Sequence, residues 1–131
     1  MKFQHIIILL CFVGVCKLSF AQNEEYKTLI QGTWVFMESE GGLLLKKAEE
    51  FEAENYGMTF FEDGTLTRRS SKGLFDINWF DHSGKWHFED STLVLLYIFD
   101  EKQKAREKVI IKQLDDQYMR LERIDWIEIR E

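Results

Sequence analysis

A basic cluster stands out in an otherwise acidic chain: Arg68-Arg69-Ser70-Ser71-Lys72. Two neighbouring arginines suit the bidentate binding of a carboxylate or phosphate group. A solvated turn between two strands accounts for the same cluster, and it is the simpler interpretation. Side chains alternate between the two faces of an extended chain. If Arg68 points inward like Leu66, two residues before it, the anion site is favoured over the solvated turn.

Two histidines and their acidic neighbours are the other candidates for chemistry. His82 and His87 lie near Asp76, Asp81 and Asp90, but their spacing matches no zinc-ligand pattern. We expect His82 to lie in a turn and both histidines to be solvated. The sequence also has no glycine-rich phosphate loop and no nucleophile elbow, and nothing pairs two carboxylates across a cleft. It therefore predicts a non-enzymatic protein with no catalytic residues, no metal and no cofactor.

Bulky apolar residues recur at alternate positions of extended segments, and 15% of the chain is aromatic. An eight-stranded barrel is just wide enough to be filled by side chains or to hold one small ligand. The sequence leaves both outcomes open: a modest apolar cavity with few polar anchors, or a filled lumen. The residues predicted to bind a ligand are Phe36, Phe60, Leu66, Arg68, Phe75, Ile77, Phe88, Leu95 and Tyr97.

The strands that must position these residues follow one another from Gly32 to the C-terminus. They are separated by short turns, such as the two-residue hairpin signal Asp63-Gly64 and an expected turn at Asp81 to Gly84, and the chain has no proline. This pattern predicts an all-β fold, an antiparallel up-and-down barrel of about eight strands. Closure would hide the sheet edges, so we expect the strand around Trp126 to pair with the first strand at Thr33.

Two helical segments are expected beside the strands. Asn23 to Ile30 predicts a short N-terminal helix that plugs one barrel end. Between the first two strands, Leu44, Ala48 and Phe51 recur at helical spacing within Leu43 to Tyr56, which predicts a short amphipathic helix. That helix would act as a lid over a cavity or as a simple cover of the barrel end, and both interpretations stay open.

The first 21 residues have the features of a signal peptide. An apolar run of 11 residues from Ile6 to Cys16 is too short to span a bilayer, and small residues at Ser19 and Ala21 suit cleavage before Gln22. We therefore expect an exported protein, periplasmic or secreted, with one domain over residues 22–131. The segment ending in Cys16 also resembles a lipoprotein acylation signal, but Val15 is too bulky, which favours soluble export over lipid anchoring.

Removal of residues 1–21 changes the composition of the domain that remains. Both cysteines, Cys11 and Cys16, would be lost, which excludes disulfides and cysteine chemistry from the mature chain. Without Lys2 and Lys17, 15 basic residues remain against 23 acidic ones, a formal net charge of −8. This balance disfavours nucleic acids, and it also disfavours an anionic membrane surface.

The order of several short motifs resembles that of lipocalin-like small exported bacterial proteins, within the calycin group of barrels. These motifs are Gly32-Thr33-Trp34, Met58-Thr59-Phe60-Phe61-Glu62-Asp63-Gly64-Thr65, Gly84-Lys85-Trp86 and Ile111-Lys112-Gln113-Leu114-Asp115-Asp116. The resemblance implies a barrel with a structural end formed by Gly32, Trp34 and Trp86. It also implies a late arginine stacked over Trp34, for which the candidates are Arg120, Arg123 and Arg130. Fatty-acid-binding barrels likewise start with a Gly-x-Trp strand and place helices before the second strand.

The resulting functional prediction is an exported protein that holds a small apolar or amphipathic ligand inside the barrel. The alternative is a protein-binding envelope module, an inhibitor or accessory subunit with a filled barrel, that uses loop tips or a patch around Trp79-Phe80 and Trp126-Ile127.

Overall fold

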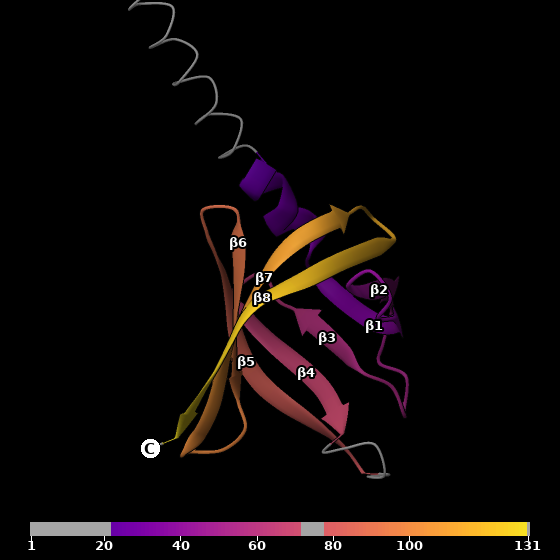
Figure 1. The fold of residues 1–131 in the computed structure, drawn as a ribbon. Helices are drawn as coiled ribbons and strands as arrows, with labels where there is room; N and C mark the ends of the chain where they lie inside the picture. Colours follow the sequence, from indigo (N-terminus) through magenta and orange to yellow (C-terminus); the bar gives the residue numbers. More distant parts are fainter. Residues whose placement is uncertain (1–21, 72–77, 131) are drawn as a thin grey trace, which may run out of the picture.

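Eight antiparallel strands close into one barrel in the computed structural model, which describes residues 22–71 and 78–130 (Figure 1). A short helix at residues 22–29 precedes the barrel. The all-β class, the eight-stranded antiparallel barrel and the N-terminal helix are thus confirmed. The strands are β1 (Gly32–Glu38), β2 (Leu43–Ala48), β3 (Gly57–Phe60), β4 (Thr65–Ser71), β5 (Trp79–Glu89), β6 (Thr92–Ile98), β7 (Gln103–Leu114) and β8 (Tyr118–Arg130).

The barrel closes through β2. From β3 to β8 each strand pairs with the next one along the chain, as in an up-and-down barrel, but β1 lies between β2 and β3. The first residues of β8 pair with β2, Leu121 opposite Leu43, whereas Trp126 pairs with Glu107 of β7. The expected pairing of the strand around Trp126 with the first strand at Thr33 is therefore wrong.

The helix expected over Leu43 to Tyr56 is also wrong. Residues 43–48 form β2, and residues 49–56 form turns and irregular structure. Leu45 is fully buried between the neighbouring strands β1 and β8. Backbone pairing on both edges outweighs the local helical spacing of Leu44, Ala48 and Phe51, because propensity is a weak preference that tertiary contacts override. Neither the helical lid nor the helical cover exists in this segment.

No turn interrupts β5, which runs continuously through the expected turn at Asp81 to Gly84. Gly84 serves a different purpose: a Cβ atom there would lie 2.1 Å from the carbonyl oxygen of Leu96 on the paired strand β6. The glycine therefore allows two strands to approach closely inside the barrel. The C-terminal strand β8 is likewise continuous, with a register shift opposite Lys108 and Val109 of β7.

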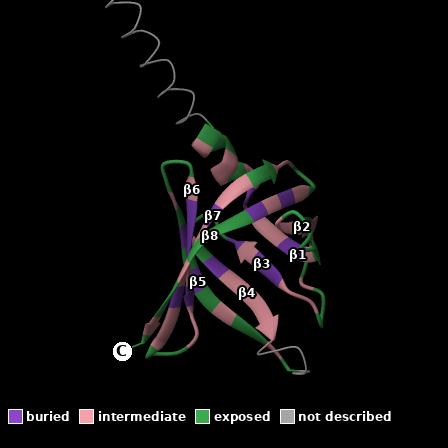
Figure 2. Cartoon of the chain, in the orientation of Figure 1, coloured by how far each residue is buried: buried purple, intermediate pink, exposed green. Residues whose placement is uncertain are grey.

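The core follows the alternation of the strands, with buried residues at every second position in the second half of β5, the middle of β7 and the beginning of β8 (Figure 2). Its buried side chains come from every strand of the barrel and from the end of the N-terminal helix. They are Ile30, Trp34, Leu45, Met58, Phe60, Leu66, Trp86, Leu93, Leu95, Tyr97, Ala105, Val109, Met119 and Leu121.

One end of the barrel is sealed around Trp34, which is fully buried. Its indole Nε1 donates to the carbonyl oxygen of Ile30 at 2.7 Å, which ties the end of the helix to β1. The Nζ atom of Lys47 lies 4.7 Å above the Trp34 ring and donates to the carbonyl oxygens of Leu29 and Gln31. Lys47 thus has the role that the family resemblance assigned to a late arginine.

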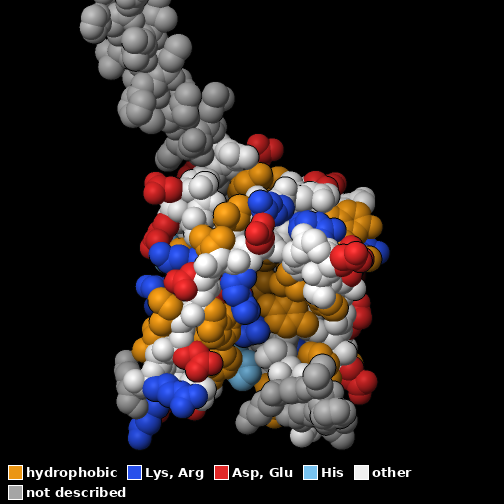
Figure 3. Space-filling view, in the orientation of Figure 1, with side chains coloured by type: hydrophobic (Ala, Val, Ile, Leu, Met, Phe, Trp, Pro, Cys, Tyr) orange, Lys and Arg blue, Asp and Glu red, His pale blue; other side chains and the backbone are white. Residues whose placement is uncertain are grey.

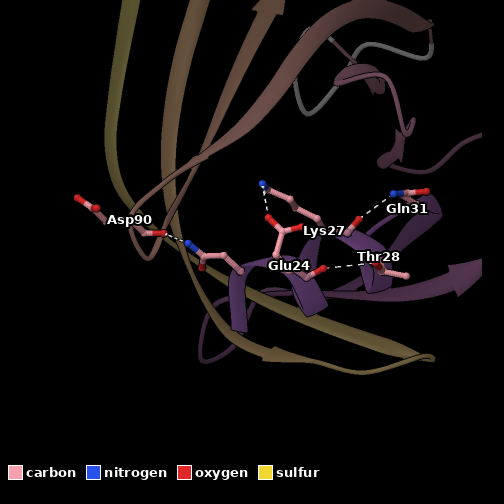
Figure 4. A network of polar contacts seen from close by, with 6 residues as sticks. Glu24, Lys27, Thr28, Gln31 and Asp90 are labelled. Carbon is pink, nitrogen blue, oxygen red and sulfur yellow. Dashed lines mark hydrogen bonds and ion pairs between the residues drawn. The ribbon is translucent and has the colours of Figure 1, made fainter. Parts of the chain in front are cut away.

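The N-terminal helix is held over this closed end by polar contacts (Figure 4). Asn23 Nδ2 donates to the carbonyl oxygen of Asp90, in the turn between β5 and β6. Within the helix, Lys27 pairs with Glu24 at 3.0 Å, and Gln31 Nε2 donates to the Lys27 carbonyl. The Asn23 contact attaches the beginning of the helix to the barrel, and the bond from Trp34 to Ile30 attaches its end.

The strands differ in length around the barrel. β1, β2 and β3 have 7, 6 and 4 residues, whereas β5, β7 and β8 have 11, 12 and 13. The pairing between β2 and β8 ends at Leu121, so residues 122–130 of β8 pair only with β7 within the described part of the chain. Closure is complete at the sealed end, and the opposite end is an open sheet of the long strands.

Candidate functional site

A cavity of about 690 Å³ lies at the open end of the barrel, opposite the sealed end. The ends of β4, β5 and β6 and the beginning of β7 form its walls together with the second half of β8. Figure 3 shows a hollow in the molecule with hydrophobic side chains at its floor and basic and histidine side chains beside them. The lining residues are Arg68, Ser70, Ser71, Phe80, His82, Phe99, Asp100, Gln103, Trp126 and Glu128.

Among the described residues, Arg68 is the only lysine or arginine that lines this cavity, and it lies among aromatic rings. Its Cζ atom is 4.3 Å from the ring centre of Tyr97, 5.2 Å from that of Tyr56 and 5.8 Å from that of Trp126. Arg68 follows Leu66 by two residues on β4, and Leu66 is buried in the core, so both side chains lie on the inward face. The buried Nε atom of Arg68 has no hydrogen-bond partner.

A buried carboxylate balances this charge. The Tyr97 hydroxyl donates to Glu107 Oε1 at 2.7 Å, and Arg123 Nε donates to Glu107 Oε2 at 2.5 Å. Only 7% of Glu107 is exposed, and it is the one charged residue that is buried among those described. Glu107 and Arg123 also line a second cavity of about 280 Å³, beside the β1–β2 turn where β8 has lost its β2 partner.

The surroundings of Arg68 and Tyr97 shift the pKa of both side chains upward. Burial opposes the charge of Arg68, but Tyr56, Tyr97 and Glu107 outweigh that effect and raise the pKa of Arg68. Burial raises the pKa of Tyr97 well above its usual value, and the nearby Tyr56 and Glu107 raise it further. Tyr97 is therefore a neutral hydrogen-bond donor and Arg68 a permanent cation at physiological pH.

The two arginines of the basic cluster point in opposite directions. Arg69 lies outside the barrel, where its Nε and NH2 atoms donate to the two carboxylate oxygens of Asp81 at 2.7 and 3.0 Å. Its NH1 atom donates to the carbonyl oxygen of Glu52. This hydrogen bonding lowers the pKa of Asp81 and occupies Arg69, so Arg68 alone faces the cavity.

The structure separates the residues that the sequence predicted to bind a ligand. Arg68 is the only one of them that lines the large cavity among the described residues. Five others pack in or against the deeper core, and Tyr97 joins that core to Arg68. Phe75 and Ile77 lie outside the described residues. The core group is Phe36, Phe60, Leu66, Phe88 and Leu95.

Gly32, Trp34 and Trp86, which the family resemblance assigned to a structural end of the barrel, lie near the sealed end. Gly32 has a φ of +113°, and a Cβ atom there would lie 2.7 Å from Nζ of Lys47. Trp86 donates from Nε1 to the carbonyl oxygen of Phe61 and packs edge-on against Phe60 at 5.8 Å.

The late arginines are all engaged away from Trp34. Arg120 donates to the carbonyl oxygen of Glu40, Arg123 pairs with Glu107, and Arg130 pairs with Glu128. Each of them lies on β8, whose first four residues alone reach β2. The residue that covers Trp34 comes instead from β2, next to the first strand.

Four aromatic or histidine residues of the cavity were not predicted as ligand contacts: Phe80, His82, Phe99 and Trp126. His82 lies on the continuous strand β5 and is half-buried, so its expected position in a solvated turn is wrong. Its ring contacts Phe99 edge-on at 5.0 Å. Its even spacing from Gly84 and Trp86 is the signal that places it inward, once β5 is recognised as one strand.

No protein-family model, curated protein or solved structure matches this chain. The eight-stranded antiparallel barrel is compatible with a calycin-type fold, and the resemblance to lipocalin-like proteins extends that far.

Two further findings concern the described residues only. Within residues 22–71 and 78–130, no three His, Cys, Asp or Glu side chains gather in a way that could hold a metal ion. The same part of the chain contains no helix of the length and hydropathy needed to cross a membrane.

Proposed function

We propose that this protein is an exported, non-catalytic binding protein for one small amphipathic molecule that carries a single anionic group. The ligand places its carboxylate or phosphate on Arg68 and its apolar part between Phe80, Phe99 and Trp126. One observation carries the proposal: a permanently charged guanidinium lies inward beneath an open cavity, and its buried Nε has no partner.

The charges around the cavity support a single anionic group. Asp100 and Glu128 line its outer part; Glu128 is paired with Arg130, and the carboxylate of Asp100 repels a second negative charge at the entrance. At the floor, Arg68 offers a charge-assisted hydrogen bond in a region of low dielectric constant, where such bonds are strong. A ligand with one anionic end and one apolar end satisfies both conditions.

The alternative, a protein-binding module, has less support. It requires an exposed patch around Trp79-Phe80 and Trp126-Ile127, but Trp126 packs inward against Tyr97 at 5.9 Å. Phe80 lines the cavity, whereas Ile127 lies on the outer face of β8, so these residues do not form one surface.

Titration with decanoate and with decanol, followed by tryptophan fluorescence, tests the proposal. Decanoate should bind saturably and decanol at least tenfold more weakly, because only the carboxylate pairs with Arg68. Arg68→Met should weaken decanoate binding by about 10- to 100-fold, which corresponds to the usual 1.5–3 kcal/mol for a hydrogen bond to a charged group.

Arg69→Met is the matched control, since it removes the same charge from the neighbouring residue on the outside of the barrel. It should leave decanoate affinity unchanged. Equal affinities for decanoate and decanol, or equal losses in the two arginine variants, would contradict the anion site.

A further inference from the structure

The outer face of strands β4 to β8 carries a patch of a different character from the rest of the molecule. The strand register places five outward residues in one row across the sheet. These are Thr65, Lys85, Leu96, Arg106 and Ile127, each opposite the next. Two cations and two aliphatic side chains thus lie side by side on neighbouring strands, and the row contains no acidic residue.

The next row, two residues along each strand, contains one cation and two aliphatic side chains, and it also has no acidic residue. It runs through Thr67, Ser83, Ile98, Lys104 and Ile129. We call these two rows together the outer basic face. The five strands β4 to β8 are neighbours in this order and form one continuous wall of the barrel (Figure 1). In a chain with 23 acidic and 17 basic residues, ten adjacent positions without one carboxylate are a marked separation of charge.

The cations of this face are not paired. Lys85, Lys104 and Arg106 form no ion pair with any residue that the structure describes, and the buried Nε of Arg106 has no hydrogen-bond partner. Ile127 is 39% exposed. The fold does not require unpaired cations or an exposed isoleucine on this face, because any polar residue, of either charge, is tolerated at an outward-facing position of a barrel.

Acidic residues border the face but do not neutralise it. Asp81 lies beyond Ser83 and is held by Arg69, and Glu89 pairs with Lys108. Asp125 lies one row further, opposite Lys108. Asp63 lies at the β4 end of the first row, where its Oδ1 accepts hydrogen bonds from the backbone N and the hydroxyl of Thr65. At physiological salt a charge acts over only about 8 Å, so Asp63 affects this end of the row and not the cations on β7. The local charge of the face, and not the net charge of the chain, therefore governs its contacts.

We propose that the outer basic face is a docking surface for an anionic lipid membrane. The three cations meet the lipid phosphates, and the aliphatic side chains between them enter the headgroup region. The composition favours a lipid surface over a protein partner. The centres of protein interfaces are enriched in aromatic residues and depleted of lysine, whereas the two rows contain no aromatic residue and two lysines.

Vesicle co-sedimentation of the full chain tests this proposal. The quantity to compare is the partition coefficient on phosphatidylcholine vesicles with and without phosphatidylglycerol, since residues 1–21 are common to every sample. The wild type should bind the anionic vesicles at least tenfold more tightly, and the difference should vanish in about 1 M salt. The triple variant Lys85→Gln, Lys104→Gln, Arg106→Gln should lose about 100-fold, or roughly fivefold per cation.

The matched control removes three cations from other parts of the molecule: Lys27→Gln, Lys46→Gln, Lys112→Gln. It changes the net charge by the same amount and should keep the preference for anionic vesicles. Far-UV circular dichroism with thermal melting establishes that both triple variants are folded. A single Ile127→Ser variant should weaken binding severalfold without changing its salt dependence.

Three outcomes would overturn the proposal. One is equal partition on both vesicle types, and another is an equal loss in the two triple variants. The third is retention on immobilised poly-L-glutamate without binding to anionic vesicles, which would assign the face to an acidic protein. Decanoate binding is independent of all three, because Arg68 lies on the opposite side of the sheet.

Discussion

The two ends of the barrel differ although the same alternating strands build both. At the sealed end, Trp34 is fully buried and its indole nitrogen is bonded to Ile30. At the open end, Arg68 has a buried nitrogen without a partner, beside a cavity. Strand length explains the difference, because β1, β2 and β3 cover only the sealed half. Closure of the sheet therefore decides where this protein has a packed core and where it has a cavity.

The largest expected effect tests the sealed end. Trp34→Ala should lower the free energy of unfolding by about 3–5 kcal/mol, because it leaves a large cavity and unlinks the helix from β1. Phe80→Ala at the open end is the comparison, and it should cost about 1 kcal/mol, since Phe80 is 38% exposed. Urea unfolding followed by circular dichroism measures both. Similar costs at the two ends would remove the distinction between core and site.

Tyr97 lies between the core and the cavity. Removal of its hydroxyl tests how much the hydrogen bond to Glu107 contributes to stability. Tyr97→Phe should lower the free energy of unfolding by about 1–3 kcal/mol, because Glu107 would lose one of its two partners while it stays buried. Tyr118→Phe on the same barrel is a suitable control, with an expected change within about 0.5 kcal/mol. A neutral Tyr97→Phe variant would show that Arg123 alone satisfies Glu107.

The pH dependence of stability also tests the burial of the Tyr97 hydroxyl. Since the pKa of Tyr97 is raised in the folded protein, the folded state retains a proton that the unfolded chain releases above about pH 10. Stability is therefore full below that pH and falls as the pH rises above it. Tyr97→Phe should show a shallower fall in urea titrations at alkaline pH. Identical slopes in the two proteins would exclude Tyr97 as the group responsible.

Lys47 has a smaller effect, at the sealed end. Lys47→Met should cost about 1–2 kcal/mol, because the contact over Trp34 and the hydrogen bonds to Leu29 and Gln31 are lost. Lys46→Met, one residue earlier and exposed, should change stability by less than about 0.5 kcal/mol. If both variants behave alike in thermal melts, Lys47 does not hold the helix in place.

The strands were predictable where their signals are local. Asp63-Gly64 marks the hairpin between β3 and β4, and the alternation around Trp86 marks the second half of β5. The identity of β2 was not predictable in this way, because its strand character comes from β1 and β8, which are distant in sequence. The lysine pair at 46–47 also interrupts the apolar alternation, although Lys47 lies over the core.

The candidate site was predictable in part for the same reason. The inward direction of Arg68 follows from its even spacing from Leu66, and the predicted anion site depends on that spacing. The Tyr97–Glu107–Arg123 contacts join three strands, so no local pattern indicates them. The cavity walls at Phe80 and His82 were hidden because Gly84 has the composition of a turn but serves a close strand contact.

The free edge of β8 has a consequence for solubility. Among the described residues, the edge of residues 122–130 that faces away from β7 has no strand partner, and such an edge can pair with the same strand of another molecule and start an intermolecular sheet. Five charges, on Glu122, Arg123, Asp125, Glu128 and Arg130, lie along this edge, and the shift opposite Lys108 distorts its first part. Charges and irregular backbone are how natural sheets discourage such growth. In this chain the charges and the register shift protect the free edge of β8, beside the accessible cavity, from pairing with another molecule.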